Sequence, residues 1–292
     1  AEIPTSIDIG SEYRYRKDIL HNKAVGVVVS QSGETMDTLE CLKKFKQNNI
    51  FSVAIVNVLN SSIARLSDYI LPTLAGPEIG VASTKAFTAQ LTVLALLSIH
   101  IVKHKKQILE SNEKNIFDSL FSLHDILEEL LDNSHPFEEI ANSLKESKSI
   151  FYIGRGTMYP LALEGALKLK EITYKHCEGY AAGELKHGPL ALIEKNIPVI
   201  ALAPYDEHFD KLISNIEEIK SRDAKIIILT DKKGEKIVKK KIKKVIVMPD
   251  SNFLTAPIIY SIPIQLIAYH LADYLGTDID QPRNLAKSVT VE

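Results

Sequence analysis

A hydroxyl-rich turn separates an apolar run from a helix-forming run early in the sequence. Residues 30–35 read Ser-Gln-Ser-Gly-Glu-Thr and follow the apolar residues 24–29. A helix N-terminus offers backbone N–H groups and a partial positive charge, so it binds an anion in two ways. The hydroxyls of Ser30, Ser32 and Thr35 would add donors, and Gly33 would let the backbone approach a ligand closely. The turn therefore predicts a phosphate site, although serine and threonine are also ordinary helix N-caps.

Features that the turn lacks indicate which class of phosphorylated ligand it would bind. It contains no lysine and does not follow the G-x-x-x-x-G-K-[ST] spacing of nucleoside triphosphate loops. We therefore expect a small phosphorylated metabolite rather than a nucleotide.

A second group of chemically capable residues recurs at helical spacing. Glu164, Lys168, Glu171 and Lys175 are four, three and four residues apart, which would place them on one helix face. Such a pattern is typical of a solvent-exposed face with alternating charges. The alternative is a carboxylate beside an ammonium, which can remove a proton next to a carbonyl while the lysine stabilises the oxyanion.

His187 lies in a loop, Gly-Glu-Leu-Lys-His-Gly-Pro, whose glycines and proline fix the backbone direction. It is either an ordinary polar residue or a proton shuttle, since histidine titrates near neutral pH. The histidines form no H-E-x-x-H pair, and Cys41 and Cys177 have no metal spacing. The dinucleotide fingerprint is also incomplete at residues 154–156. We therefore expect no metal and no cofactor.

Composition excludes several classes of partner. The chain has 292 residues, enough for two domains, and a net charge of −2, so nothing global attracts nucleic acid. Only two cysteines occur, which favours a reducing, cytoplasmic location. The longest apolar run, residues 91–102, is too short to span a bilayer, so we expect a buried helix there and no membrane partner. The lysine-rich residues 232–244 lack aromatics and predict a solvated loop and edge.

Apolar strand-like runs alternate with amphipathic helical patterns, as in a doubly wound parallel α/β sheet. The expected strands are residues 24–29, 52–56, 69–73, 149–153, 199–203, 225–230 and 244–248. A polar helical stretch, residues 103–142, reads as a connector. We therefore predict a phosphate-binding first domain (1–140), a second domain of the same flavodoxin-like type (141–275) and a C-terminal tail (276–292).

The two halves resemble each other. Gly-Glu-Leu at 183–185 leads to the strand at 199–203, and Gly-Ser-Glu at 10–12 leads in the same way to the strand at 24–29. The second half also has an earlier strand, turn and helix, residues 149–174, without a counterpart before Ala1. We therefore expect the first domain to lack its first strand and helix, a unit of about 30 residues. In the second half, Ala-Pro-Tyr-Asp-Glu at 203–207 stands where the first half has its hydroxyl-rich turn. An acidic pair repels phosphate, so only the first half should bind it.

Together these motifs resemble the glucosamine-6-phosphate synthase family, specifically its isomerase part with two sugar isomerase (SIS) domains and a tail. The residues that carry the resemblance, which covers essentially the whole chain, are 30–35, 78–87, 164–171, 184–191 and 280–292. The turn at 30–35 indicates only the wider SIS superfamily, whereas the tail is far more specific. The resemblance implies synthesis of glucosamine 6-phosphate from fructose 6-phosphate and glutamine. The N-terminal glutaminase domain of the family is absent from this chain.

The resemblance also assigns roles to individual positions. It implies that Ser30, Gln31, Ser32 and Thr35 hold the sugar phosphate and that Val81, Ser83 and Ala286 line the sugar. Glu171 would move a proton between C1 and C2, supported by Lys168 and Glu164. Lys287 would form a Schiff base with the C2 carbonyl. His187 would help to open the sugar ring in the site of a neighbouring subunit, so the active form would be a homodimer.

Two other functions remain open. A plain phosphosugar aldose–ketose isomerase would share the phosphate turn but would not need the Leu-Ala-Lys tail at 285–287. A non-catalytic sugar-phosphate regulator would carry a DNA-binding helix-turn-helix, and the terminal regions contain no basic recognition helix.

Overall fold

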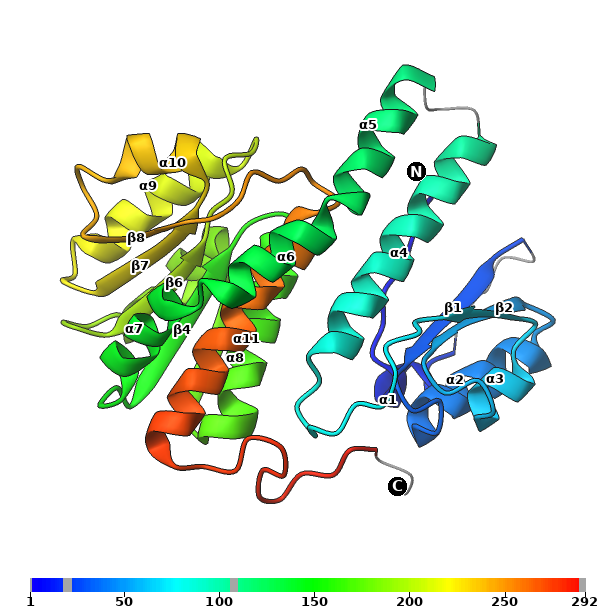
Figure 1. Cartoon of the computed structure of the whole chain (residues 1–292). Coiled ribbons are helices and arrows are strands. Elements are labelled where there is room, and N and C mark those ends of the chain that lie inside the picture. Colours follow the sequence, from blue (N-terminus) through cyan, green and yellow to red (C-terminus); the bar gives the residue numbers. More distant parts are fainter. Residues whose placement is uncertain (1, 18–22, 106–109, 289–292) are drawn as a thin grey trace. The chain divides into compact units, whose positions relative to one another are not determined.

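The computed structural model describes residues 2–17, 23–105 and 110–288 (Figure 1). By packing, the chain divides into a first unit, Ala1–Glu110 with Asn284–Glu292, and a second unit, Ser111–Arg283. This grouping does not test the domain boundary near residue 140, which stays a prediction. Residues 106–109 of the expected connector and 289–292 of the expected tail lie outside the described residues.

The first unit is built around a three-stranded parallel sheet in the order β1-β2-β3. Its elements are α1 (Gly10–Tyr13), β1 (Val25–Ser30), α2 (Met36–Gln47), β2 (Phe51–Val56), α3 (Ser62–Leu66), β3 (Tyr69–Pro72) and α4 (Lys85–His104). Helices α2 and α3 cover one face of the sheet, where Val28, Leu42 and Ile63 form a common core. In β1 every second residue is buried, as expected for a strand with one covered face.

The second unit contains a five-stranded parallel sheet in the order β5-β4-β6-β7-β8. Its α-helices are α5 (Glu110–Phe121), α6 (Leu123–Asp132), α7 (His135–Leu144), α8 (Met158–Thr173), α9 (Phe209–Lys220), α10 (Lys232–Val238) and α11 (Ala256–Leu275). Its strands are β4 (Ser149–Gly154), β5 (His176–Ala181), β6 (Pro198–Leu202), β7 (Lys225–Thr230) and β8 (Lys244–Val247), and two 3₁₀ turns, η1 (Ala182–His187) and η2 (Pro189–Leu192), follow β5.

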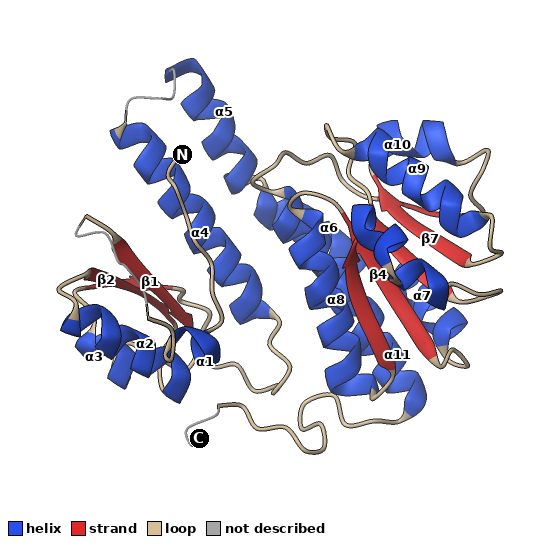
Figure 2. Cartoon of the chain, turned by 180° about the vertical axis from the view of Figure 1, so that it is seen from behind, coloured by secondary structure: helices blue, strands red, loops and turns tan. Residues whose placement is uncertain are grey.

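Both faces of the second sheet are covered, because its central strands are apolar at nearly every position. Phe151 and Ile153 of β4 belong to a core shared with α9 and α10. The alternate residue Tyr152 faces α8, where Gly165 leaves room for its ring. The figures show α9 and α10 on one side of this sheet and α8 with α11 on the other (Figure 2). This arrangement is the α/β class that we expected.

Every strand predicted from sequence is present to within one or two residues, and the helix predicted from about Pro160 to Tyr174 is α8. One strand, β5, was missed. Its sequence, His-Cys-Glu-Gly-Tyr-Ala, is not an apolar run, and it pairs with β4 alone at the edge of the sheet. An edge strand is not buried between two neighbours, so its sequence carries a weaker signal.

The predicted duplication is visible in the order of elements. In the first unit β1, β2 and β3 alternate with α2, α3 and α4, and in the second β6, β7 and β8 alternate with α9, α10 and α11. A short helical turn precedes each series, α1 before β1 and η1 before β6. The second unit adds β4 on the free side of β6, with α8 after it. In the described part of the first unit, no strand takes that place beside β1.

The expectation that residues 91–102 form a buried helix was only half correct. They lie in α4, a helix of 20 residues, but only Ala86, Ala95 and Ile99 of α4 are buried. The corresponding helix α11 is largely buried because it packs along α8. By length and composition α4 could also cross a membrane, a property that it shares with core helices of globular proteins. The absence of a membrane partner therefore stays a prediction.

Candidate active site

The hydroxyl-rich turn at residues 30–35, called the phosphate turn after its predicted ligand, lies between the end of β1 and the start of α2, as predicted. Ser30 is the last residue of β1, and Thr35 is the N-cap residue of α2. Ser30 Oγ accepts a hydrogen bond from Gly33 N at 3.0 Å and lies 3.1 Å from Thr35 Oγ1. Ser32 Oγ accepts from Glu34 N at 3.2 Å. The Thr35 hydroxyl makes no cap to its own helix, so the ordinary N-cap interpretation does not explain this threonine.

Two neighbouring residues, Ser61 and Ser62, fix the backbone of this turn. Gly33 has a φ of +66°, and a Cβ there would lie 2.0 Å from Ser61 Oγ, so a side chain is excluded both by the backbone and by space. Glu34 Oε1 accepts from Ser62 N at 2.7 Å at the start of α3. The hydrogen bonds from Ser62 lower the pKa of Glu34, so the turn carries a fixed negative charge at its outer side.

Asn57, which the sequence did not single out, connects the phosphate turn to the next loop. It follows β2, and its N–H donates to Gln31 O at 3.2 Å. Its side chain donates to Gly76 O at 2.7 Å and accepts from Ala75 N at 2.9 Å. A polar residue directly after a buried strand was the available signal, because the carboxyl ends of parallel strands are where α/β folds bind ligands.

The loop from Glu78 to Thr84 carries two of the predicted sugar-lining residues, Val81 and Ser83, both partly exposed. Lys287 of the tail contacts this loop, since its Nζ donates to Gly80 O at 2.5 Å. Ala286, the third predicted lining residue, is exposed. The structure thus brings the tail lysine to the loop that we expected to line the sugar.

The charged residues predicted on α8 form a compact cluster. Lys168 is only 4% exposed, and its Nζ lies 2.6 Å from Glu171 Oε2 and 3.4 Å from Glu164 Oε1. A lysine is almost never this buried unless it is paired. The solvent-exposed interpretation of this helix face is therefore wrong for these three residues.

The two carboxylates of this cluster differ. Burial raises the pKa of Glu164, and the nearby charge of Glu171 adds to the effect, although Lys168 opposes it. Glu171 Oε2 is buried and lies at ion-pair distance from Lys168, but it accepts no aligned hydrogen bond from the described residues. A carboxylate oxygen that is held by charge alone keeps its lone pairs available for a proton.

Lys175 does not belong to this face, which corrects our expectation. The α-helix ends at Thr173 with Tyr174 in a left-handed conformation, so the helical spacing no longer applies. Lys175 Nζ instead donates to Lys145 O at 2.6 Å and Ser147 O at 2.9 Å. His187 ends η1 and is exposed, and among the described residues no contact joins it to the α8 cluster.

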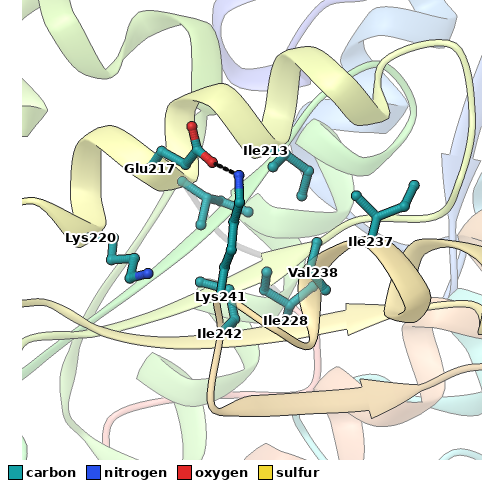
Figure 3. Close-up of a pocket in the computed structure, with 9 residues that line it drawn as sticks. Ile213, Glu217, Lys220, Ile228, Ile237, Val238, Lys241 and Ile242 are labelled. Carbon is teal, nitrogen blue, oxygen red and sulfur yellow. Dashed lines mark hydrogen bonds and ion pairs between the residues drawn. The ribbon is translucent and has the colours of Figure 1, made fainter.

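The second unit also has an apolar hollow, which is separate from the predicted site residues. It lies between α9, α10 and β7, where Ile213, Ile228 and Ile242 face it, and the Glu217–Lys241 ion pair of 2.5 Å lies at it (Figure 3). None of the predicted site residues lines this hollow. It has no buried polar group that could orient a sugar, so we do not assign chemistry to it.

No group of three or more histidine, cysteine or acidic residues suited to a metal occurs within the described residues. Both cysteines are buried and free. Burial raises the pKa of Cys177 to about 12, so its reactive thiolate is not formed near neutral pH.

Comparison with known proteins adds the family. The SIS domain model matches residues 1–100 and 143–272. Over 292 residues the chain is 50% identical to glutamine–fructose-6-phosphate aminotransferase [isomerizing] of Bradyrhizobium diazoefficiens and 51% identical to that of Bartonella quintana. Both matches cover 100% of this chain and 48% of the relative, so the chain spans about half the length of the curated relatives it matches.

Solved structures agree with this match. The C-terminal domain of glucosamine-fructose-6-phosphate aminotransferase from Francisella tularensis has a TM-score of 0.91 at 42% identity, covering 96% of this chain and 79% of that one. A glucosamine-6-phosphate deaminase from Thermotoga maritima has a TM-score of 0.74 at 20% identity, covering 96% and 80%, which shows a shared fold. The chain belongs to the SIS domain family and corresponds to the C-terminal isomerase part of these aminotransferases.

Proposed function

We propose that this chain carries the sugar-binding and isomerising steps by which fructose 6-phosphate and ammonia become glucosamine 6-phosphate. The observation that carries the proposal is the buried Lys168 between the carboxylates of Glu164 and Glu171. A buried ion-paired cluster is costly to maintain, and strongly perturbed titratable groups gather at functional sites. The similarity to named aminotransferases supplies the substrate class.

The phosphate of the sugar would bind at the N-terminus of α2, held by Ser30, Gln31, Ser32 and Thr35. The turn is prepared for this role, because Gly33 and Glu34 already fix its backbone. Charge-assisted hydrogen bonds contribute about 1.5–3 kcal/mol each, so several of them would make the phosphate the main source of affinity.

The chemistry would use three groups. The amine of Lys287 would attack the C2 carbonyl and release water, which forms a Schiff base, and ammonia would later displace the lysine to give the amino sugar. Glu171 would remove a proton from C1 and return it to C2, with Glu164 and Lys168 orienting its carboxylate. Val81, Ser83 and Ala286 would line the sugar.

The direct test is to incubate the chain with fructose 6-phosphate and to measure glucose 6-phosphate and, with ammonium present, glucosamine 6-phosphate. Calorimetry with fructose and fructose 6-phosphate tests the phosphate turn separately. Equal affinity for the two sugars would contradict the phosphate site. Formation of glucose 6-phosphate without any adduct at Lys287 would favour a plain phosphosugar isomerase. Binding without turnover would favour a regulatory sugar-phosphate module.

The active form would be a cytoplasmic homodimer in which His187 helps to open the sugar ring in the partner's site. The exposure of His187 at the end of η1 supports a role in the site of another subunit. If this holds, inactive His187→Ala chains mixed with inactive Lys287→Ala chains should regain part of the activity once they exchange subunits. No recovery in confirmed heterodimers would contradict the shared site. Glutamine hydrolysis would belong to the part of the aminotransferases that lies outside the matched 48%.

A further inference from the structure

Glu78 makes more hydrogen bonds than its position in a surface loop would require. Its Oε2 accepts from Ser83 Oγ at 3.0 Å and from Ala86 N at 2.9 Å. Its Oε1 accepts from Thr84 N at 3.1 Å and Thr84 Oγ1 at 3.2 Å. The carboxylate therefore closes the loop from Glu78 to Thr84 and also binds the first turn of α4.

This arrangement replaces an ordinary helix cap. Thr84 is the N-cap residue of α4, but its side chain makes no cap to its own helix and points instead to Glu78. A carboxylate at the N-terminus of a 20-residue helix is favoured by the helix dipole and by the N–H groups there. Burial raises the pKa of Glu78, but the hydrogen bonds from Thr84, Ala86 and Ser83 outweigh it, so the pKa lies below its usual value and the group stays ionised.

The charge of Glu78 also acts on the tail. The ammonium of Lys287 is near enough for its charge to lower the pKa of Glu78, and it donates to Gly80 O within the same loop. The loop carbonyl and the carboxylate together give Lys287 one anchored position. Neutralising the carboxylate would remove this charge from the surroundings of the Lys287 amine.

We infer that Glu78 is a positioning residue that holds the loop 79–84 and the Lys287 amine in the arrangement that captures the sugar carbonyl. This inference rests on the proposed function, in which Lys287 forms the Schiff base. It adds Glu78 to the residues that the proposed function uses. It also sets the role of Ser83, because the single hydroxyl hydrogen of Ser83 is directed to Glu78, so Ser83 can only accept from a sugar hydroxyl.

The first test does not need turnover. Wild-type chain, Glu78→Gln and Glu78→Asp are acylated briefly with a lysine-reactive reagent, and the rate at Lys287 is compared with that at exposed Lys239 by mass spectrometry. Glu78→Gln keeps the size but removes the charge and one acceptor oxygen. We expect Lys287 to react roughly threefold faster or more in this variant, because the anchored arrangement opens more often. The matched control is Glu40→Gln, which removes a partly exposed carboxylate paired with Lys43 and should change nothing.

The second test adds fructose 6-phosphate and borohydride, which reduces a Schiff base to a stable amine. At saturating sugar, Glu78→Gln should trap the adduct at Lys287 about tenfold or more slowly, because small misplacements of a reacting group are costly. The affinity for fructose 6-phosphate should stay close to wild type, since the phosphate turn is untouched. If the trapping rate at Lys287 and the affinity for fructose 6-phosphate fall together, Glu78 is only structural and the inference is wrong.

The outcomes separate this inference from the proposed function. An unchanged acylation rate at Lys287 in both Glu78 variants overturns the positioning role. No adduct at Lys287 in the wild-type chain overturns the Schiff-base proposal, while the acylation rates still decide whether Glu78 anchors the tail. If Glu78→Gln is not folded, as shown by the lack of a cooperative unfolding transition, the test uses Glu78→Asp, which keeps the charge. The acylation rate and the trapping rate at Lys287 in that variant then decide.

Discussion

At the scale of single residues, the cluster on α8 supports the proposed proton transfer more than it supports the stability of the fold. A buried ion pair is weak support for a fold, because desolvation offsets much of the attraction. Lys168 lies at ion-pair distance from two carboxylates at once, and one carboxylate oxygen of the cluster still accepts no aligned hydrogen bond from the described residues. The oxygen without an aligned hydrogen bond belongs to Glu171, the residue to which the resemblance assigns the proton.

The first prediction removes this base. Glu171→Gln keeps the shape of the side chain but cannot accept the C1 proton. We expect exchange of the sugar's C1 or C2 proton with deuterated solvent to fall by about 10²–10⁴-fold, with sugar affinity nearly unchanged. Proton exchange is followed by NMR in fructose 6-phosphate. Exchange at the normal rate in this variant would refute the assignment.

The second prediction uses two glycines with the same backbone angle. Gly33 and Gly76 both have a φ of +66°, but a Cβ on Gly33 would collide with Ser61, whereas a Cβ on Gly76 would meet nothing within 4 Å. Gly33→Ala should therefore distort the phosphate turn and weaken fructose 6-phosphate binding by more than tenfold, or about 1.4 kcal/mol. Gly76→Ala carries only the backbone strain and should bind nearly as wild type. Similar affinities for both variants, measured by calorimetry, would contradict the role of the turn.

At the scale of elements, the sequence predicted strands and helices well because apolar periodicity is a local property. It missed β5, whose pattern is polar, and it extended the charged face of α8 to Lys175, because the left-handed Tyr174 that ends the helix has no clear local signal. Of the site, hydroxyls and charges could be found from residue type and spacing. The contacts of Asn57, Glu34 and Glu78 could not, because each depends on which loops the fold brings together.

The third prediction belongs to α8 as a folded element and concerns pH. The raised pKa of Glu164 means that the folded state binds its proton more tightly than the unfolded state does. Its contribution is therefore fully present below the unfolded pKa and is lost as the pH rises through the folded pKa. Relative to Glu164→Gln, the wild-type chain should become less stable as the pH rises above about 4.5. Urea denaturation at several pH values measures this difference. The exposed control Glu194→Gln should show the same pH dependence of the unfolding free energy as the wild type. A difference in unfolding free energy between wild type and Glu164→Gln that stays constant with pH would contradict the pKa shift.

At the scale of the whole molecule, the two units differ in one strand and one helix. In the second unit β4 lies between β5 and β6, and α8 packs against α11. Among the described residues of the first unit, β1 pairs with β2 alone, and Val25, Val27 and Val29 are 56%, 41% and 40% exposed. Helix α4, which corresponds to α11, exposes Leu94 and Leu96. Both observations support the proposal that the first domain is completed by a further strand and helix.

The last prediction tests this completion directly. The segment of about 30 residues that precedes the matched region in the Bradyrhizobium diazoefficiens relative is fused before residue 1, a length that suits one strand and one helix. Leu94 and Leu96 are 37% and 44% exposed, so covering them adds only the remaining part of the about 1.5–3 kcal/mol that a buried leucine contributes and should raise the unfolding temperature by roughly 2–8 °C. Hydrogen exchange should slow in β1 and α4 and stay unchanged in β7 of the second unit. The control fusion carries a proline in the middle of the added strand, which removes a ladder donor. If the two fusions have equal stability and exchange, the open edge of β1 is not the place of the added strand. A chain whose α4 is already protected without the fusion, and which sediments as a dimer, would show that a second copy covers this helix instead.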